Sequence, residues 1–424
     1  MRIVSGLVVA GLLMALPARA AEPAPAPQPA SKYAKLFESV WSTTNKNFYD
    51  PHFLGHDWKA IGARYRARLG SVHTDEEFAR LTGQMLDELG ASHLYIVPPH
   101  SSAASGVGIG VQFRDFSGVS IVSDVDPLSD ARAKGIKIGD RLLSPAKALR
   151  GAPGTMADVK LKTCTGAVRT LKVVREGAYW PPVHPGFAWH AVRVGPDRSI
   201  GYLRIDRFDD GAAPLIDQAM EELKDTDGLI IDVRENSGGN FSAARLISYF
   251  SGPSQIAIAL FSRPYLEKLG HPVTAADVRA APKVIGAYTT PQVFEAVSKN
   301  GGGAAFMTEN LHDKEYTKPV VVLIGGDTGS AAEGFAAMMH RMTTAKLVGR
   351  ETEGALLSSE HFDLSDGWQL VVPVSGLWAA DGTDYRDRPT PPDINVTWKP
   401  GDLCSGRDPD IEKAKALLNL TATQ

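Results

Sequence analysis

A serine stands where an apolar strand gives way to a helix. Residues 319–324 are apolar and mostly β-branched, a glycine-rich turn follows, and a helix-like segment begins at Ser330. The first turn of a helix has unpaired backbone N–H groups and the positive end of the helix dipole. These groups would stabilise an alkoxide or the oxyanion of a tetrahedral intermediate. Ser330 is therefore a candidate nucleophile for acyl transfer.

A structural alternative competes for the same serine. Ser330 and Glu333 also fit the S-x-x-E capping box, in which the serine hydroxyl only closes the end of a helix. This segment taken alone favours the cap, and the segments described below reverse that preference.

Composition limits the classes of function. The 424 residues are 43% hydrophobic and 22% charged, with a formal net charge of −3. A chain of this length can bury a large core and form two or three domains. Near-neutral charge without a basic block argues against a nucleic-acid partner. Zinc-type spacings such as C-x-x-C or H-E-x-x-H are absent from the sequence, so we expect neither a metal nor another cofactor.

The N-terminus has the pattern of an export signal. Arg2, an apolar run over residues 3–16 and a small-residue cleavage site at 18–20 predict a signal peptide over residues 1–20. A Pro/Ala-rich linker follows over residues 21–31. We expect a periplasmic or secreted protein without an integral membrane span in the mature chain. Cys164 and Cys404 lie far apart in sequence, and we favour two unpaired thiols.

Three further regions are expected to fold. Residues 32–100 carry apolar residues at helical spacing, with Thr74 as an N-cap and Glu77 three positions later. Residues 105–178 contain alternating strands. Residues 190–424 alternate strands and helices, with an insertion at about 264–318 that is helix-prone and lacks strand alternation.

The region 105–178 resembles a PDZ domain. The resemblance rests on the glycine-rich loop at 106–111 and the run AKGIKIGD at 133–140. It implies that the loop presents backbone N–H groups to the terminal carboxylate of a peptide, which adds to a neighbouring strand edge. The residues concerned are Gly108, Ile109, Gly110 and Val111. Because the loop is not G-x-G-x-x-G, dinucleotide binding is not expected.

Seven segments together resemble the S41 serine peptidases, which include tail-specific and tricorn-like proteases. In chain order they are GYLRIDRF, GLIIDVRENSGGN, PVVVLIGGDTGSAAEG, LVGRETEGALL, LSDGWQLVVP, TPPDINV and RDPDIEKA. The resemblance covers nearly the whole mature chain. It implies an α/β, crotonase- or ClpP-like peptidase core with an N-terminal helical domain and an inserted, mostly β PDZ domain.

The resemblance also assigns roles to residues. Ser330 matches the nucleophile, Gly238 and Gly239 match the turn that contributes to the oxyanion hole, and the Ala331 N–H would be the second donor. Glycine suits the turn because the backbone must approach the substrate carbonyl closely.

The general base is inferred from two positions: one where the family's lysine is missing, and one where a histidine is present. Processing proteases carry a lysine in a T-x-G-K-G segment, and here Ala355 occupies that position. Tricorn-like members instead use a histidine after the N-terminal helices. His93 matches that base, and Ser92 matches the serine that orients it. We therefore expect a Ser–His site rather than a Ser–Lys dyad.

The supporting acid departs from the family pattern. Arg386 stands where tricorn-like enzymes place a glutamate. Asp387 is the nearest acid and our choice, and Glu360 is an alternative.

The resulting expectation is an exported serine peptidase acting on unfolded or C-terminally exposed polypeptides recognised through the PDZ domain. The oligomeric state is left open. A second hypothesis is a catalytically impaired pseudoprotease that binds peptides through its PDZ groove, which Ala355 and Arg386 motivate. A lipase-like hydrolase ranks last because the G-x-S-x-G elbow is missing.

Overall fold

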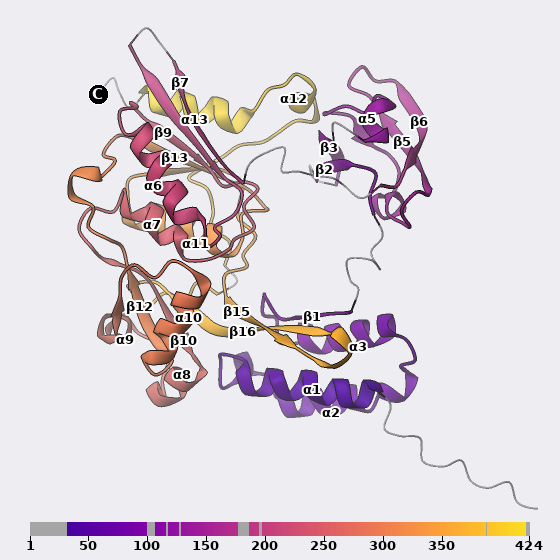
Figure 1. Ribbon diagram of the computed structural model, residues 1–424, viewed down its shortest axis with the longest axis vertical. Helices are drawn as coiled ribbons and strands as arrows, with labels where there is room; N and C mark the ends of the chain where they lie inside the picture. Colours follow the sequence, from indigo (N-terminus) through magenta and orange to yellow (C-terminus); the bar gives the residue numbers. More distant parts are fainter. Residues whose placement is uncertain are drawn as a thin grey trace, which may run out of the picture.

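The computed structural model describes residues 32–99, 107–115, 118–126, 129–176, 186–194, 197–386 and 388–420. The expected signal peptide and linker lie outside these residues. Three parts are visible in Figure 1: a helical layer at the bottom, a small β-sheet unit at the upper right, and a large α/β body on the left. Within the described residues, no helix combines the length and apolar character that crossing a bilayer requires.

The helical layer consists of three helices, α1 (Lys32–Asn47), α2 (Trp58–Arg66) and α3 (Asp75–Asp87). The expected cap of α3 is confirmed: the Glu77 N–H donates to the Thr74 hydroxyl, and the Thr74 N–H donates to the Glu77 carboxylate. Apolar faces of the helices pack on a sheet, with Phe78 edge-on against Trp368 at 5.1 Å between ring centroids. This packing joins the helical layer to the α/β body.

The small unit is a five-stranded antiparallel sheet with its own hydrophobic core. Its strands are β2 (Val111–Asp115), β3 (Ser120–Val125), β4 (Arg141–Leu142), β5 (Met156–Lys162) and β6 (Val168–Val174). Burial alternates strictly along β5, so that alternate side chains face a core one layer thick. The short helix α5 (Asp130–Ala133) lies beside β6.

The main sheet of the α/β body has the order β17-β14-β13-β9-β8-β7 and is parallel except for β7. Its strands are β7 (Phe187–Arg193), β8 (Ser199–Ile205), β9 (Leu229–Asp232), β13 (Val320–Ile324), β14 (Lys346–Gly349) and β17 (Ile394–Asn395). All four residues of β9 are buried, as a strand covered on both faces requires.

Helices cover both faces of this sheet. One face packs against α6 (Ala212–Leu223), α7 (Ser242–Ser248) and α11 (Ser330–Met342), and the other against the C-terminal α13 (Pro409–Leu420). The carboxyl ends of β9 and β13 lie side by side, because the two strands are paired and parallel. The loops after them, which carry Gly238 and Ser330, therefore meet at one edge of the sheet.

A buried ion cluster fixes the C-terminal helix to the sheet. Arg234, just after β9, pairs with Asp232 at 2.7 Å and with Asp408 and Asp410 at 2.9 Å. Arg350 adds a second pair to Asp410 at 2.7 Å. Because each charge has a partner, the cost of burying the carboxylates is offset.

A second sheet lies between the main sheet and the helical layer. Its order is β1-β16-β10-β12-β11, and β15 pairs with the other side of β16. Its strands are β1 (Tyr95–Val97), β10 (Ile256–Ser262), β11 (Lys283–Val284), β12 (Gly303–Met307), β15 (Ser358–Asp363) and β16 (Gln369–Trp378).

Residues 264–318 contain two strands that their lack of alternation did not reveal. Helices α8 (Arg263–Leu269), α9 (Ala275–Ala280) and α10 (Thr290–Lys299) agree with a helix-prone insertion, but β11 and β12 also lie in this segment. β12 is nearly all buried between β10 and β11 and carries Gly303-Ala304-Ala305, so it lacks the polar alternation that would reveal a strand.

The expectation of two unpaired thiols was wrong. Cys164, in the turn between β5 and β6, forms a disulfide with Cys404 of α12 (Pro400–Cys404), with 5.6 Å between the Cα atoms. The sulfurs approach over Gly139, where a β-carbon would stand 2.7 Å from each of them. The bond spans 240 residues of sequence and fastens the five-stranded unit to the α/β body.

Candidate active site

A pocket of about 380 Å³ lies where the carboxyl edge of the main sheet meets the second sheet. Ser330 and Ala331 of α11, Gly239 of the turn after β9, and His93 of the loop before β1 all line it. Four of the residues that the sequence nominates thus reach one cavity from three separate segments.

Ser330 begins α11 in an unusual conformation. Its φ is +48°, the left-handed region that a non-glycine residue enters only at a cost. Its N–H donates to the carbonyl oxygen of Ala355 at 3.0 Å. The preceding Gly329 N–H donates to the carbonyl oxygen of Asn236, also at 3.0 Å. The strained serine is therefore held from two neighbouring loops, a geometry that exposes a nucleophile in other hydrolases.

The capping-box interpretation of Ser330 is contradicted. Gly329 occupies the N-cap position of α11, and no side chain caps this end of the helix. The Glu333 carboxylate turns away from Ser330 and accepts the N–H groups of Gly354 and Ala355. The Ser330 hydroxyl is consequently not used to close the helix.

The glycine turn after β9 lies directly against the serine. Gly238 has φ +118° and Gly239 has φ +136°, and a β-carbon on Gly239 would overlap the carbonyl oxygen of Phe208 at 1.7 Å. The Gly238 N–H donates to the side-chain oxygen of Asn236 at 2.8 Å. This bond occupies the Gly238 donor, so Gly239, which lines the pocket, is the better candidate of the pair.

His93 is placed by the strand that follows it. Tyr95 of β1 pairs with Val371 of β16, and the buried Leu94, the residue after His93, anchors the loop. His93 itself has φ +58°. Its Nδ1 lies 3.1 Å from the Ser92 hydroxyl, so a proton on Nδ1 would leave Nε2 with a lone pair. Ser92 is thus in the position expected of a residue that orients the ring.

Neither of the acids nominated from the sequence is observed in the pocket. Asp387 lies outside the described residues. Glu360 is on β15 but does not line the pocket. Arg386 faces a separate cavity of about 730 Å³, where its guanidinium donates to the Tyr49 hydroxyl at 3.3 Å.

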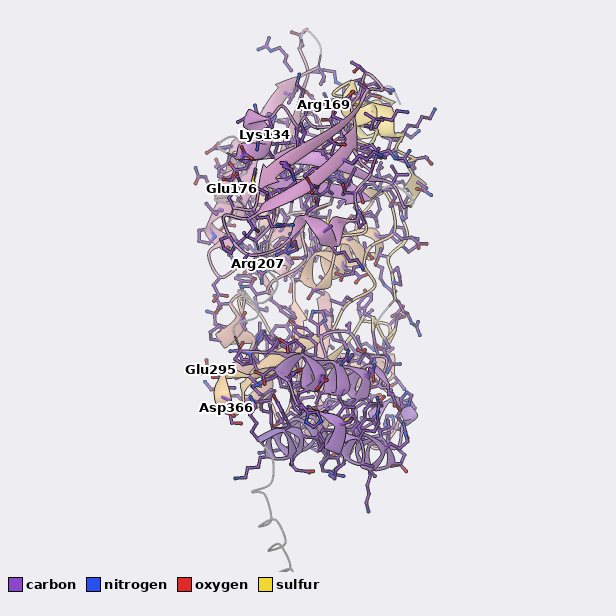
Figure 2. The ribbon with its side chains drawn as sticks, turned by 90° about the vertical axis from the view of Figure 1, so that its right-hand side faces the viewer. Lys134, Arg169, Glu176, Arg207, Glu295 and Asp366 are labelled. Atoms are coloured by element: carbon purple, nitrogen blue, oxygen red, sulfur yellow. A yellow bond between two sulfur atoms is a disulfide. The ribbon has the colours of Figure 1, made fainter. Side chains whose placement is uncertain are left out.

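The sequence did not nominate the individual residues that line the rest of the pocket. Polar and apolar side chains line the pocket in about equal measure. The apolar ones come from the loop before α7, from α10, from the segment before β15 and from β16, and they include Phe241, Val293, Phe294, Leu356 and Leu377. Arg207, exposed after β8, and the exposed His361 of β15 also line it. Figure 2 shows Arg207 at the level between the five-stranded unit above and the helical layer below. Single apolar residues in four distant segments carry no local signal.

The loop expected to bind a peptide terminus lies in the five-stranded unit. Ile109 is buried, and Val111 begins β2. Gly110 has φ +70°, and a β-carbon there would stand 2.6 Å from that of Ser129. Gly108 accepts the Glu176 N–H at 3.0 Å through its carbonyl oxygen. Glycine at 110 is therefore demanded by its neighbours in the fold, whatever the loop binds.

Across the part of the chain that the structure describes, no three His, Cys, Asp or Glu side chains cluster closely enough to hold an ion.

Two parts of the chain match known protein families. Residues 199–396 match the sequence model of peptidase family S41, and residues 29–87 match that of the tricorn protease C1 domain. The carboxyl-terminal-processing protease of Picosynechococcus sp. is 25% identical, covering 92% of this chain and 89% of its own length.

A tricorn-type relative and a solved structure extend the comparison. Tricorn protease homolog 1 of Streptomyces coelicolor is 24% identical over 92% of this chain, and the chain spans 35% of that protein. This chain thus covers about a third of the length of the tricorn-type relatives it matches. The photosystem II D1 C-terminal processing protease has the same fold, with a TM-score of 0.55 at 19% identity, covering 92% of this chain and 97% of that one. The chain therefore carries a segment, residues 199–396, that matches peptidase family S41, and it is related to the C-terminal processing proteases.

Proposed function

We propose that this protein is an exported serine peptidase in which Ser330 is the nucleophile and His93 the general base. One observation carries the proposal: a strained serine at the start of a helix shares a pocket with a histidine and with a glycine turn that the serine touches. Nucleophile, base and oxyanion donors are the three parts that serine-based acyl transfer requires.

The proposed reaction follows from the positions of these groups. His93 Nε2 takes the hydroxyl proton as Ser330 Oγ attacks the peptide carbonyl carbon. The oxyanion accepts the N–H groups of Ala331 and Gly239, helped by the positive end of α11. His93 then gives its proton to the leaving amine, which releases an acyl-enzyme. Water, deprotonated by His93, hydrolyses the ester and restores Ser330.

The substrate would be an extended polypeptide. Of the described strands, only β16 pairs with β15, so the opposite edge of β15 carries backbone groups that another strand can use. Ser358, Ser359 and His361 of this strand line the pocket beside Ser330. The apolar part of the wall, formed by Phe241, Val293, Phe294, Leu356 and Leu377, would hold an apolar side chain next to the cleaved bond, because a charged group pressed against that part would lose its hydration.

The five-stranded unit would recruit substrates by their C-termini, through Gly108, Ile109, Gly110 and Val111. The disulfide between Cys164 and Cys404 supports export, because such bonds persist mainly in oxidising compartments such as the periplasm or the extracellular space.

The test compares wild type with Ser330→Ala and His93→Ala on a reduced and alkylated, unstructured protein. His340→Ala is the matched control, because His340 is an exposed histidine on the same helix as Ser330 and does not line the pocket. A fluorophosphonate probe, with mass spectrometry of the adduct, reports the reactivity of Ser330 independently of turnover.

We expect wild type and His340→Ala to cleave and to be labelled at Ser330. Loss of the base should lower the rate by about 10²–10⁴-fold, and Ser330→Ala should abolish labelling. Cleavage by Ser330→Ala at the wild-type rate would refute the nucleophile. A wild-type protein that neither cleaves nor is labelled would leave the pseudoprotease hypothesis in its place.

A further inference from the structure

A buried carboxylate lies one helical turn after the candidate nucleophile. Glu333 of α11 is 1% exposed, and among the described residues no basic side chain lies within ion-pair distance of it. Its neighbours on the helix, Ala332, Phe335 and Ala336, are apolar and fully buried. A carboxylate in such a position is costly unless hydrogen bonds compensate it. Its contacts should therefore explain its presence.

Three of the donors around this carboxylate belong to one short loop between β14 and β15. The Thr352 hydroxyl and the Gly354 N–H donate to Oε1, the latter at 3.0 Å, and the Ala355 N–H donates to Oε2 at 2.7 Å. Burial raises the pKa of Glu333, and these hydrogen bonds oppose that rise. An ionised carboxylate can only accept hydrogen bonds, so it matches the three donors that this loop directs toward it.

The same loop controls the backbone of the serine. The carbonyl oxygen of Ala355 accepts the Ser330 N–H at 3.0 Å, so Ala355 is bonded to the helix at both its N–H and its C=O. The Glu353 N–H donates to the carbonyl oxygen of Thr328, also at 3.0 Å, two residues before the serine. Glu333, the loop and Ser330 thus form a closed ring of hydrogen bonds.

A further bond extends this ring. The Thr352 hydroxyl, whose proton is given to Glu333, accepts the N–H of Thr390 at 2.7 Å. The segment that begins at residue 388 is therefore linked to the same carboxylate through the Thr352 hydroxyl. Removing that hydroxyl would break its hydrogen bond to Glu333 and its hydrogen bond from Thr390 at once.

We propose that Glu333 is a positioning residue for catalysis: its carboxylate fixes the 352–355 loop, and the loop holds Ser330 in its left-handed conformation beside the oxyanion donors. The inference rests on the proposed peptidase function. A non-glycine residue with φ +48° persists only where its surroundings enforce it, and the Ala355 carbonyl is the group that Glu333 holds against Ser330. Here a carboxylate takes the position of a capping-box glutamate but acts on a loop that lies 19 to 22 residues further along the chain.

The first variant is Glu333→Gln, which keeps the size and removes the charge. Its amide group must present an NH₂ to one set of backbone donors, so the loop cannot bond at both oxygens. Glu309→Gln is the control, because Glu309 is a partly buried carboxylate paired with Arg245 in the same body and lies outside the pocket. We expect kcat to fall about 10–100-fold in Glu333→Gln, with KM within threefold of wild type and fluorophosphonate labelling slowed in parallel. Glu309→Gln should keep kcat within twofold.

A second pair of variants decides the case in which Glu333→Gln does not fold. Thr352→Val keeps the shape and loses the hydroxyl, whereas Thr352→Ser keeps the hydroxyl. We expect Thr352→Ser to retain kcat and Thr352→Val to lose at least fivefold, with KM unchanged in both.

Two outcomes would overturn the inference, and they are distinguishable from failure of the peptidase itself. A folded Glu333→Gln protein that melts earlier but keeps the wild-type kcat would show a merely structural role, as would equal kcat values for the two Thr352 variants. Absence of cleavage and labelling in the wild type would instead refute the peptidase, and the positioning role with it.

Discussion

Gly238 lies so close to Ser330 that a β-carbon on the glycine would stand 2.6 Å from Cβ of the serine and 3.1 Å from its Oγ. The same β-carbon would lie 3.2 Å from the backbone nitrogen of Ala331. The turn after β9 and the start of α11 therefore share one small volume, and the glycine supplies space as well as a positive φ of +118°.

Gly238→Ala should abolish most activity without unfolding the protein. The added methyl group must displace Ser330 or the turn, which separates the hydroxyl from the oxyanion donors. Loss of one such donor lowers kcat by about 10²–10³-fold, and we expect the kcat of Gly238→Ala to fall by at least this factor. Steady-state kinetics and fluorophosphonate labelling measure it.

The matched control for this change is Gly326→Ala. Gly326 lies in the turn after β13, has no heavy atom within 4 Å of an added β-carbon and no left-handed φ. It should retain wild-type kcat. Equal activity of the two alanine variants would argue against the turn as part of the catalytic site.

The pocket walls predict the side chain beside the cleaved bond. Wild type should cleave a peptide with leucine at that position at least 10-fold faster than one with aspartate, measured as kcat/KM. Phe294→Lys places an ammonium group on an apolar wall and should reverse or erase this preference. A wild type that cleaves both peptides equally would show that this pocket does not select the side chain.

The sequence could predict elements better than the contacts between them. The strand at 319–324 and the helix from Ser330 follow from local patterns, and both were found as β13 and α11. Strand β11 was missed because its two residues are too few to show an alternating pattern. Strand β12 was missed because its run of glycine and alanine does not alternate between polar and apolar residues.

Side-chain contacts between distant segments needed the structure. Glu333 has the spacing of a capping box, and only the fold shows that the 352–355 loop takes its carboxylate instead. The pairing of Cys164 with Cys404 depends on the docking of the five-stranded unit, which no sequence spacing encodes. His93 was nominated through a resemblance to a family, and its path to the pocket depends on the pairing of β1 with β16.

Removing the disulfide should loosen the five-stranded unit. Cys164→Ser with Cys404→Ser should cost about 2–5 kcal/mol, because the bond restricts the unfolded chain across a long loop. Thermal unfolding with and without a reductant measures this. Reductant should lower the Tm of wild type to that of the double variant and leave the double variant unchanged. Two free thiols in the unreduced wild-type protein, found by mass spectrometry, would contradict the bond.

The buried ion cluster predicts both a large mutational cost and acid sensitivity. Arg234→Met leaves Asp232 buried without its ion-pair partner and takes from Asp410 one of its two guanidinium partners, and should cost about 3–5 kcal/mol of unfolding free energy. Arg66→Met is the control, because Arg66 and its partner Glu38 are both about half exposed at the surface. It should cost at most about 1 kcal/mol.

The pH dependence of the cluster has a definite sign. Burial alone would raise the pKa of Asp232, but the Arg234 guanidinium and the Tyr202 hydroxyl hold that pKa below its ordinary value of 3.8. A carboxyl whose pKa is lower in the folded state contributes stability that is present above the ordinary pKa and is lost as the pH falls through the folded one. Denaturant unfolding from pH 7 down to pH 2 should therefore show a loss in wild type below about pH 4 that is shallower in Asp232→Asn. Parallel curves for the two proteins would show that Asp232 is not the carboxyl that couples stability to acid.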